Sequence, residues 1–117
     1  MSGDFVWAIK NGDLDQVKDH VEKKAVNVNE EVDGRPLILY AADYGQKDVI
    51  DYLVSAGADV NSKDKHGITA ILAAIWEGHV DCVRLLIEKG ASKEGTAPDG
   101  KSYLESAENN EIRKLLV

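Results

Sequence analysis

Two stretches of the chain repeat one another: DGRPLILYAADYGQKDVIDYLVSAGADVN over residues 33–61 and KHGITAILAAIWEGHVDCVRLLIEKGASK over residues 65–93. Each has a glycine near its start, then a pair of alanines in close register (41/42 and 73/74). A second glycine, an apolar run and a final Gly-Ala follow in both. This similarity indicates an internal repeat.

The glycines give the period of the repeat, because several sets of them recur every 33 residues: Gly12, Gly45 and Gly78; Gly34, Gly67 and Gly100; Gly57 and Gly90. A period of this length is typical of one supersecondary unit that cannot bury its apolar face alone. Stacked copies of such a unit form one continuous core, in which each copy touches its neighbours.

Each unit reads as turn, helix, turn, helix. Residues 36–44 and 69–77 predict the first helix, which ends at a glycine able to adopt the left-handed conformation. The second helix carries an apolar stripe at spacing i, i+1, i+4, i+5, as in Val49, Ile50, Leu53 and Val54. The stretch ADVNSKDKHG, residues 58–67, is turn-rich and predicts a hairpin-like turn, with His66 helping to fix it.

The opening motif carries a resemblance to a known family. The ankyrin pattern Gly-x-Thr-Pro-Leu-His-x-Ala-Ala is matched at residues 34–42 and 67–74, with a degraded copy at 100–107. Together with WAIKNGDLDQVKDHV, YAADYGQ, DKHGIT, EGHVDCVRLLIEKGA and APDG, the chain resembles the myotrophin family of short ankyrin-repeat proteins. The resemblance implies a single domain, an all-α ankyrin-repeat solenoid of four helix-turn-helix units with short hairpin-like turns. We expect units at about 1–33, 34–66, 67–99 and 100–117, with the outer two acting as caps.

The chain departs from the ankyrin pattern at several scaffold positions. Leu39 and Leu72 replace the histidine that hydrogen-bonds between repeats in this family, so apolar packing has to replace that contact. Pro36 stands at the threonine position, which removes a hydroxyl from the turn. These departures leave open that the chain is an engineered ankyrin scaffold without a natural partner.

Composition argues against several classes of function. The formal net charge is −7, and no cluster of Lys and Arg suited to nucleic acid is present. No apolar run has membrane-spanning length, and no signal sequence is visible. The single cysteine, Cys82, lies in an apolar helix run and is expected to be a buried thiol in a reducing compartment.

No arrangement of residues predicts catalysis. The three histidines are not placed with a nucleophile, no Cys/His spacing suits zinc, and no phosphate-binding loop is present. We therefore expect neither enzyme activity nor a cofactor or metal. An acidic surface is suited instead to meeting a basic patch on another protein.

The candidate binding surface follows from the family's architecture, since ankyrin arrays bind through turn tips and the exposed side of the first helices. The residues around Gly12, Gly45 and Gly78 then become the candidate partner contacts: Trp7, Lys10, Asn11, Asp13, Asp43, Tyr44, Gln46, Trp76, Glu77 and His79. For Trp7, covering the first helix pair is an equal alternative. Tyr40 is better explained as a packing residue, and Asp43 and Glu77 have the alternative of being solvated charges.

The resemblance also implies a partner. Proteins of the myotrophin family bind the heterodimeric actin capping protein and mask its basic actin-binding surface, which blocks capping of filament barbed ends. An inhibitor of Rel-type transcription factors is a further alternative. The expected location is the cytoplasm, with the nucleus as a second site, and the capped ends favour a monomer.

Overall fold

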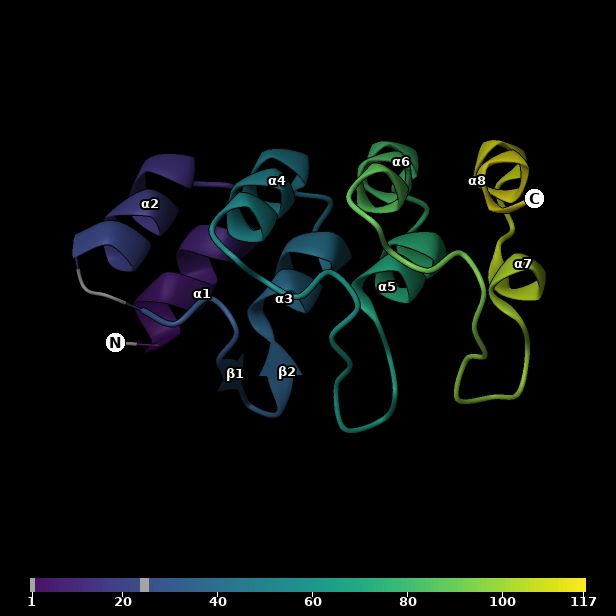
Figure 1. The fold of residues 1–117 in the computed structure, drawn as a ribbon, viewed down its shortest axis with the longest axis horizontal. Helices are drawn as coiled ribbons and strands as arrows, with labels where there is room; N and C mark the ends of the chain where they lie inside the picture. The colour runs from purple at the N-terminus through teal and green to yellow at the C-terminus, as the bar shows by residue number, and fades with distance from the viewer. Residues whose placement is uncertain (1, 24–25) are drawn as a thin grey trace.

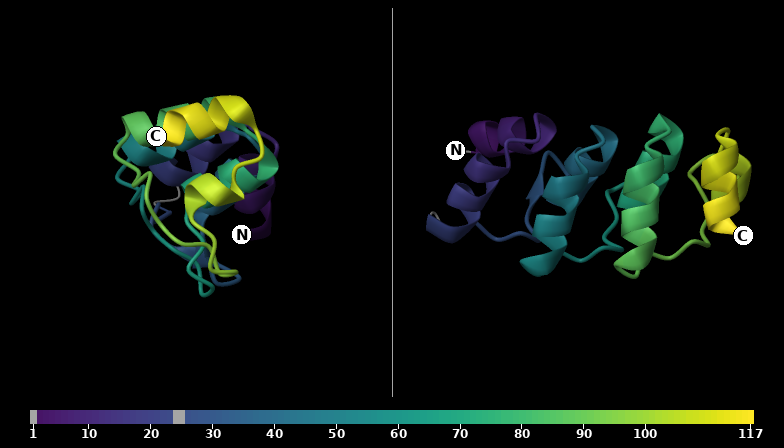
Figure 2. Two further views of the ribbon diagram at one scale, coloured as in Figure 1. Left: turned by 90° about the vertical axis from the view of Figure 1, so that its right-hand side faces the viewer. Right: turned by 90° about the horizontal axis from the view of Figure 1, so that it is seen from above.

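The computed structural model describes residues 2–23 and 26–117 and shows helices stacked in pairs (Figure 1). The first helices of the pairs form one row and the second helices form a second row beside it. Viewed from above, the pairs follow one another along the long axis of the molecule (Figure 2), which measures 41 × 25 × 21 Å. The predicted all-α solenoid is confirmed, and its helices are α1 (Ser2–Lys10), α2 (Leu14–Lys23), α3 (Leu37–Asp43), α4 (Lys47–Ser55), α5 (Ala70–Glu77), α6 (Val80–Glu88), α7 (Tyr103–Ser106) and α8 (Asn110–Leu116).

Hairpin-like turns project from one side of the stack (Figure 1). The first contains strands β1 (Glu31–Val32) and β2 (Arg35–Pro36), which pair antiparallel. The later two are closed by single bridges, Lys63 to Thr69 and Thr96 to Ser102. None of the helices in the described part of the chain has the length and hydropathy that crossing a bilayer requires.

Asp64 holds the second hairpin turn through its side chain. Its Oδ1 accepts hydrogen bonds from the backbone amides of His66, at 2.8 Å, and Ile68, at 2.9 Å. The side chain of His66 is exposed, and the contact that His66 contributes to the turn comes from its backbone. The side chain of Asp64, and not that of His66, therefore fixes this turn, as an Asx-type turn.

The core runs along the whole stack between the two rows of helices. Leu39 and Leu72 are fully buried, which confirms that apolar packing occupies the positions of the inter-repeat histidine. Pro36 leaves the start of α3 without a side-chain cap, whereas Thr69 Oγ1 accepts a hydrogen bond from the amide of Leu72 at 3.3 Å. The same hydroxyl lies 2.8 Å from the hydroxyl of Tyr103, so Thr69 also joins two neighbouring repeats.

The register of the repeats corrects one detail of the sequence comparison. With Gly45 placed on Gly78, Ala41 corresponds to Ala74, and the two alanine pairs are offset by one residue. Tyr40 consequently corresponds to Ala73. The small side chains at 41 and 74, both with no exposed surface, mark the position where neighbouring first helices approach.

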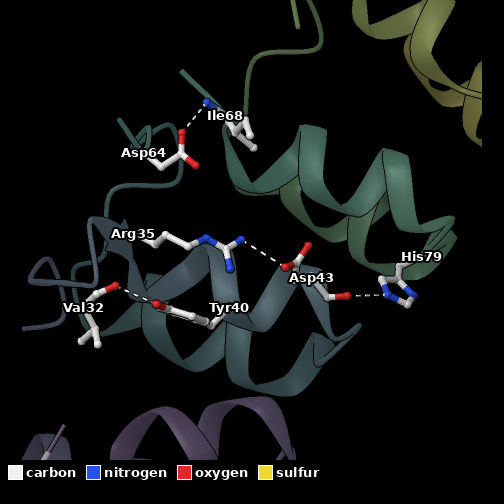
Figure 3. A network of polar contacts seen from close by, with 7 residues as sticks. All are labelled: Val32, Arg35, Tyr40, Asp43, Asp64, Ile68 and His79. Atoms are coloured by element: carbon white, nitrogen blue, oxygen red, sulfur yellow. Dashed lines mark hydrogen bonds and ion pairs between the residues drawn. The ribbon is translucent and has the colours of Figure 1, made fainter. Parts of the chain in front are cut away.

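One polar contact between repeats recurs at equivalent positions. Gln46 Nε2 donates a hydrogen bond of 2.8 Å to the carbonyl oxygen of Lys10. His79 Nε2 lies 3.0 Å from the carbonyl oxygen of Asp43 (Figure 3), and because a carbonyl only accepts, this nitrogen carries the proton. The second and third repeats are thus each tied to the repeat before by the residue after the helix-ending glycine, and we call these two contacts the inter-repeat clamps.

Each clamp lies against a glycine of the preceding repeat. Gly45 has φ 70°, a conformation that costs other residues free energy, and a Cβ added there would lie 2.8 Å from His79 Nδ1. Gly78 has nearly the same φ of 73°, but a Cβ there would meet nothing within 4 Å. Gly45 is therefore constrained by its backbone and by its neighbour, and Gly78 by its backbone alone.

This difference predicts unequal costs for two equivalent substitutions. Gly78→Ala should lower the free energy of unfolding by about 1–2 kcal/mol, the cost of left-handed backbone for an L-residue. Gly45→Ala should lower it by a further ~1 kcal/mol, because the added methyl displaces His79 and breaks its hydrogen bond. Urea denaturation of both variants measures the difference, and equal losses would show that the clamp does not contribute to stability.

Candidate functional site

The ten candidate contact residues lie at equivalent positions of successive repeats. Apart from Trp7 they form three rows spaced by 33 residues, in the last turn of α1, α3 and α5 and in the turn after it. We call them the ladder surface, whose rows are Lys10–Asp43–Trp76, Asn11–Tyr44–Glu77 and Asp13–Gln46–His79.

Three aromatic side chains of the ladder surface point into solvent. The exposed fractions are 57% for Trp7, 51% for Tyr44 and 44% for Trp76. Trp7 is the most exposed of the three, and both explanations of it, partner contact and cover for the first helix pair, are consistent with this exposure. Tyr40 is buried and its hydroxyl donates 2.7 Å to the carbonyl of Val32, so it is a packing residue. Exposed aromatic rings of this kind offer large contact area to a partner.

Four members of the ladder surface form hydrogen bonds between their side chains and the backbone of the chain. The amide nitrogen of the Asn11 side chain donates 2.8 Å to the carbonyl of Trp7. Asp13 Oδ1 accepts a 3.2 Å hydrogen bond from the amide of Gln16 at the start of α2. Gln46 and His79 form the inter-repeat clamps. These four side chains position the surface, whatever contact they also make with a partner.

Lys10 lies beside two aromatic rings of the next repeat. Its Nζ is 5.6 Å from the ring centre of Tyr40 and 5.4 Å from that of Tyr44. Both distances are within the range of a cation–π attraction, which holds the lysine over the first and second repeats. Lys10 and Asp13 carry opposite formal charges at the N-terminal end of the ladder surface, whereas Glu77 gives its C-terminal end a negative charge.

Arg35 adjoins the ladder surface and was not predicted as a site residue. Its Nη2 lies 3.1 Å from Asp43 Oδ2, and its guanidinium carbon lies 4.7 Å from the ring centre of Tyr40 (Figure 3). Arg35 comes from β2 and Asp43 from the end of α3, so the hairpin brings them together. The sequence did not predict this contact, because Arg35 and Asp43 lie in different elements. A spacing of eight residues predicts a contact only when both residues are on the same helix or strand.

Two hollows adjoin Trp76. One, of about 550 Å³, is lined by Ile75, Trp76, Glu77, Gly78, Ser106, Glu108 and Asn109. The other, of about 400 Å³, is lined by Asp33, Arg35, Asp43, Asp64, Lys65, His66, Ile68, Ala73 and Trp76.

The larger hollow exists because the last repeat departs from the others. Helix α7 has four residues where α5 has eight, so it ends short of the ladder surface. The residue before α8 is Asn109, which corresponds to His79 before α6, and its side chain accepts the backbone amides of Glu111 and Ile112. A Cβ added at Gly78 would meet nothing within 4 Å, so no side chain reaches back over this glycine. The indole of Trp76 and the carboxylates of Glu77 and Glu108 therefore border open space.

The chemistry of these side chains suits recognition. In the described residues, no group of three or more His, Cys, Asp or Glu side chains is placed to hold a metal ion. Indole and phenol rings bind the faces of guanidinium and ammonium groups, and carboxylates pair with them. The ladder surface thus presents exposed aromatic rings and carboxylates, the kinds of group that contact basic side chains.

Cys82 is buried on α6, as expected. Burial, reinforced by the charge of Asp81, raises the pKa of its thiol from 9.0 to about 11. Since the thiolate is the reactive form, at about pH 8 the folded protein has roughly a hundredfold less of it than an exposed thiol would.

The buried thiol predicts slow labelling. An aromatic disulfide reagent should react with Cys82 far more slowly in buffer than in denaturant.

The raised pKa of Cys82 also predicts how stability depends on pH. The folded state holds the thiol proton of Cys82 more tightly than the unfolded state, so the free energy of unfolding should fall as the pH rises from about 9 to about 11. Labelling rates with and without urea test the first expectation and urea midpoints across that pH window test the second. Equal labelling rates would contradict the burial.

Comparison with known proteins agrees with the fold. Ankyrin repeats, in three copies, match residues 5–97. The chain is 53% identical over 114 residues to myotrophin of Xenopus tropicalis, covering 97% of this chain and 96% of that protein. It is 31% identical over 97 residues to protein phosphatase 1 regulatory subunit 27 of Homo sapiens, covering 82% of this chain and 63% of that one. It is also 31% identical over 119 residues to E3 ubiquitin-protein ligase hecd-1 of Caenorhabditis elegans, covering 96% of this chain but only 4% of the ligase.

The ankyrin repeats that match this chain make it a protein–protein interaction module. The similarity to myotrophin extends over nearly the full length of both chains. The chain belongs to the ankyrin-repeat family, as a myotrophin-like member of it.

Proposed function

We propose that the protein binds the heterodimeric actin capping protein and masks the basic surface with which capping protein docks on filament barbed ends. The near full-length similarity to myotrophin supports this partner, because the resemblance to that family implies it. The proposed site is the ladder surface together with Glu108. The proposed place of action is the cytoplasm, with the nucleus as a second location.

The observation that carries the proposal is the environment of Trp76. Its ring is 44% exposed, although burying an indole is strongly favourable, and it borders two hollows with acidic side chains. An exposed indole beside carboxylates is the arrangement that binds the guanidinium or ammonium group of a partner. The net charge of −7 favours encounter with a basic surface over long range.

The proposed mechanism is competition, with no covalent step. A stable protein–protein interface covers about 800 Å² on each partner. A molecule measuring 41 × 25 × 21 Å can cover such an area. Occupying the basic surface of capping protein would exclude the barbed end from the same residues. Because charge attraction contributes to the encounter, binding should weaken as ionic strength rises.

Two substitutions test the site. Trp76→Ala with Glu77→Ala should weaken binding to purified capping protein by about tenfold to a hundredfold, since an exposed tryptophan at an interface is a common hot spot. Titration calorimetry gives the affinity, and assembly of pyrene-labelled actin with capping protein gives the activity. Barbed-end growth should resume as the wild-type protein is added and should need more of the variant.

The control is Glu88→Ala on α6, an exposed carboxylate outside the ladder surface. It removes one acidic charge and should leave the affinity within about twofold of wild type. Urea midpoints show whether each variant is folded. If the Trp76 and Glu77 variant binds as tightly as wild type, these two residues are not in the site. If wild type leaves capping untouched, the proposed function is wrong, and a Rel-type partner or a scaffold without partner becomes the better explanation.

A further inference from the structure

Asp43 is the carboxylate at the middle of the ladder surface, and it is held on two sides. Its carbonyl oxygen accepts the clamp hydrogen bond from His79, which fixes the backbone. Its side chain pairs with Arg35 at 3.1 Å. Both side chains of the pair remain partly exposed, at 28% for Arg35 and 31% for Asp43, so a partner can reach them.

The guanidinium of Arg35 is preorganised for this contact. It lies 4.7 Å from the ring centre of Tyr40, and the ring is fixed because its hydroxyl donates 2.7 Å to the carbonyl of Val32. Figure 3 shows the side chain extending across Tyr40 toward Asp43. The planar guanidinium is suited to stacking and pairing at once, which a lysine could not do in the same way.

The pair forms part of the wall of the smaller hollow beside Trp76. Arg35, Asp43 and Trp76 all line this space of about 400 Å³. The neighbouring carboxylate of Asp64 differs from Asp43, because its Oδ1 accepts two backbone amides and holds the turn. Asp43 therefore has a carboxylate that holds no turn and can pair with a cation of a partner. It lies next to the exposed indole of Trp76, but Arg35 already neutralises its charge.

We propose that Arg35 is an internal competitor for the partner's cation. Resting on the function proposed above, the inference is that an arginine or lysine of the basic partner must displace Arg35 to pair with Asp43 and contact Trp76. Arg35 thus lowers the affinity of the ladder surface for every basic surface. A partly exposed ion pair contributes little to stability, so a partner that makes further contacts can displace Arg35 at a small cost in binding free energy.

The predicted result is a gain of affinity on removing a positive charge. Arg35→Met and Arg35→Gln should each bind capping protein about threefold to fivefold more tightly than wild type, the upper part of the range expected for freeing one partly exposed carboxylate. The matched control is Lys23→Met on α2, whose ion pair with Asp19 at 3.1 Å lies outside the ladder surface. It changes the net charge equally and should leave affinity within about twofold.

A double-substitution test separates Asp43 from the overall charge. In an Asp43→Asn background, Arg35→Met should give no gain, because the freed carboxylate is absent. Two neutral replacements of Arg35 are used because one of them could impair folding. The urea midpoints show whether each variant is folded, and a folded variant is sufficient to test the inference. Unchanged or weaker binding by a folded Arg35 variant would overturn the inference, as would an equal gain for Lys23→Met.

A second probe makes the inference independent of the particular partner. An oligoarginine peptide should bind the Arg35 variants more tightly than wild type, with the same dependence on Asp43. If this order holds while wild type fails to bind capping protein, the inference stands and the proposed function falls. If wild type binds capping protein but neither probe distinguishes the Arg35 variants, the function stands and the inference falls.

Discussion

Each repeat of this protein can bury its apolar face only against its neighbours, so the contact between repeats determines everything built on it. Buried leucines at the former histidine positions supply the apolar part of that contact, and the clamps supply its direction. Because Gln46 and His79 reach back over a glycine to a carbonyl 36 residues earlier, slippage of one repeat on the next would break a hydrogen bond. Fixed register aligns equivalent side chains into rows, so that residues from separate helix ends form one continuous surface.

The same constraint explains why the surface opens where it does. Between the second and third repeats the clamp of His79 fills the space over Gly45. Over Gly78 no side chain performs this role, and the short α7 leaves the end of α5 uncovered. Trp76 and Glu77 are exposed at the boundary between the third and fourth repeats, where the short α7 covers little of α5. The shortened last repeat therefore leaves a hollow beside Trp76 that the proposed partner could enter.

The sequence predicted the features that repeat and missed those that depend on a turn. The 33-residue period of the glycines was sufficient to predict the helices, their stacking and the exposure of Tyr44 and Trp76, because each of these features follows from a residue's position within the repeat unit. The pairing of Arg35 with Asp43 was missed, since it requires the hairpin to return β2 beside α3. Gln46 was assigned to partner contact alone, because a polar residue after a helix-ending glycine looks the same whether it meets a partner or a carbonyl.

An acidic, aromatic surface raises a problem of specificity that its own contacts help to solve. With a net charge of −7, the protein attracts many basic surfaces, and an open carboxylate beside an indole would bind arginine side chains with little discrimination. Pairing Asp43 with Arg35 lowers the affinity for all of them by a similar factor. A surface that offers only charge then binds weakly, whereas one that also covers Trp7, Tyr44 and Trp76 gains contact area that the internal pair does not oppose. The arginine within the acidic face therefore makes selection depend on shape and apolar contact, with charge left to bring the partners together.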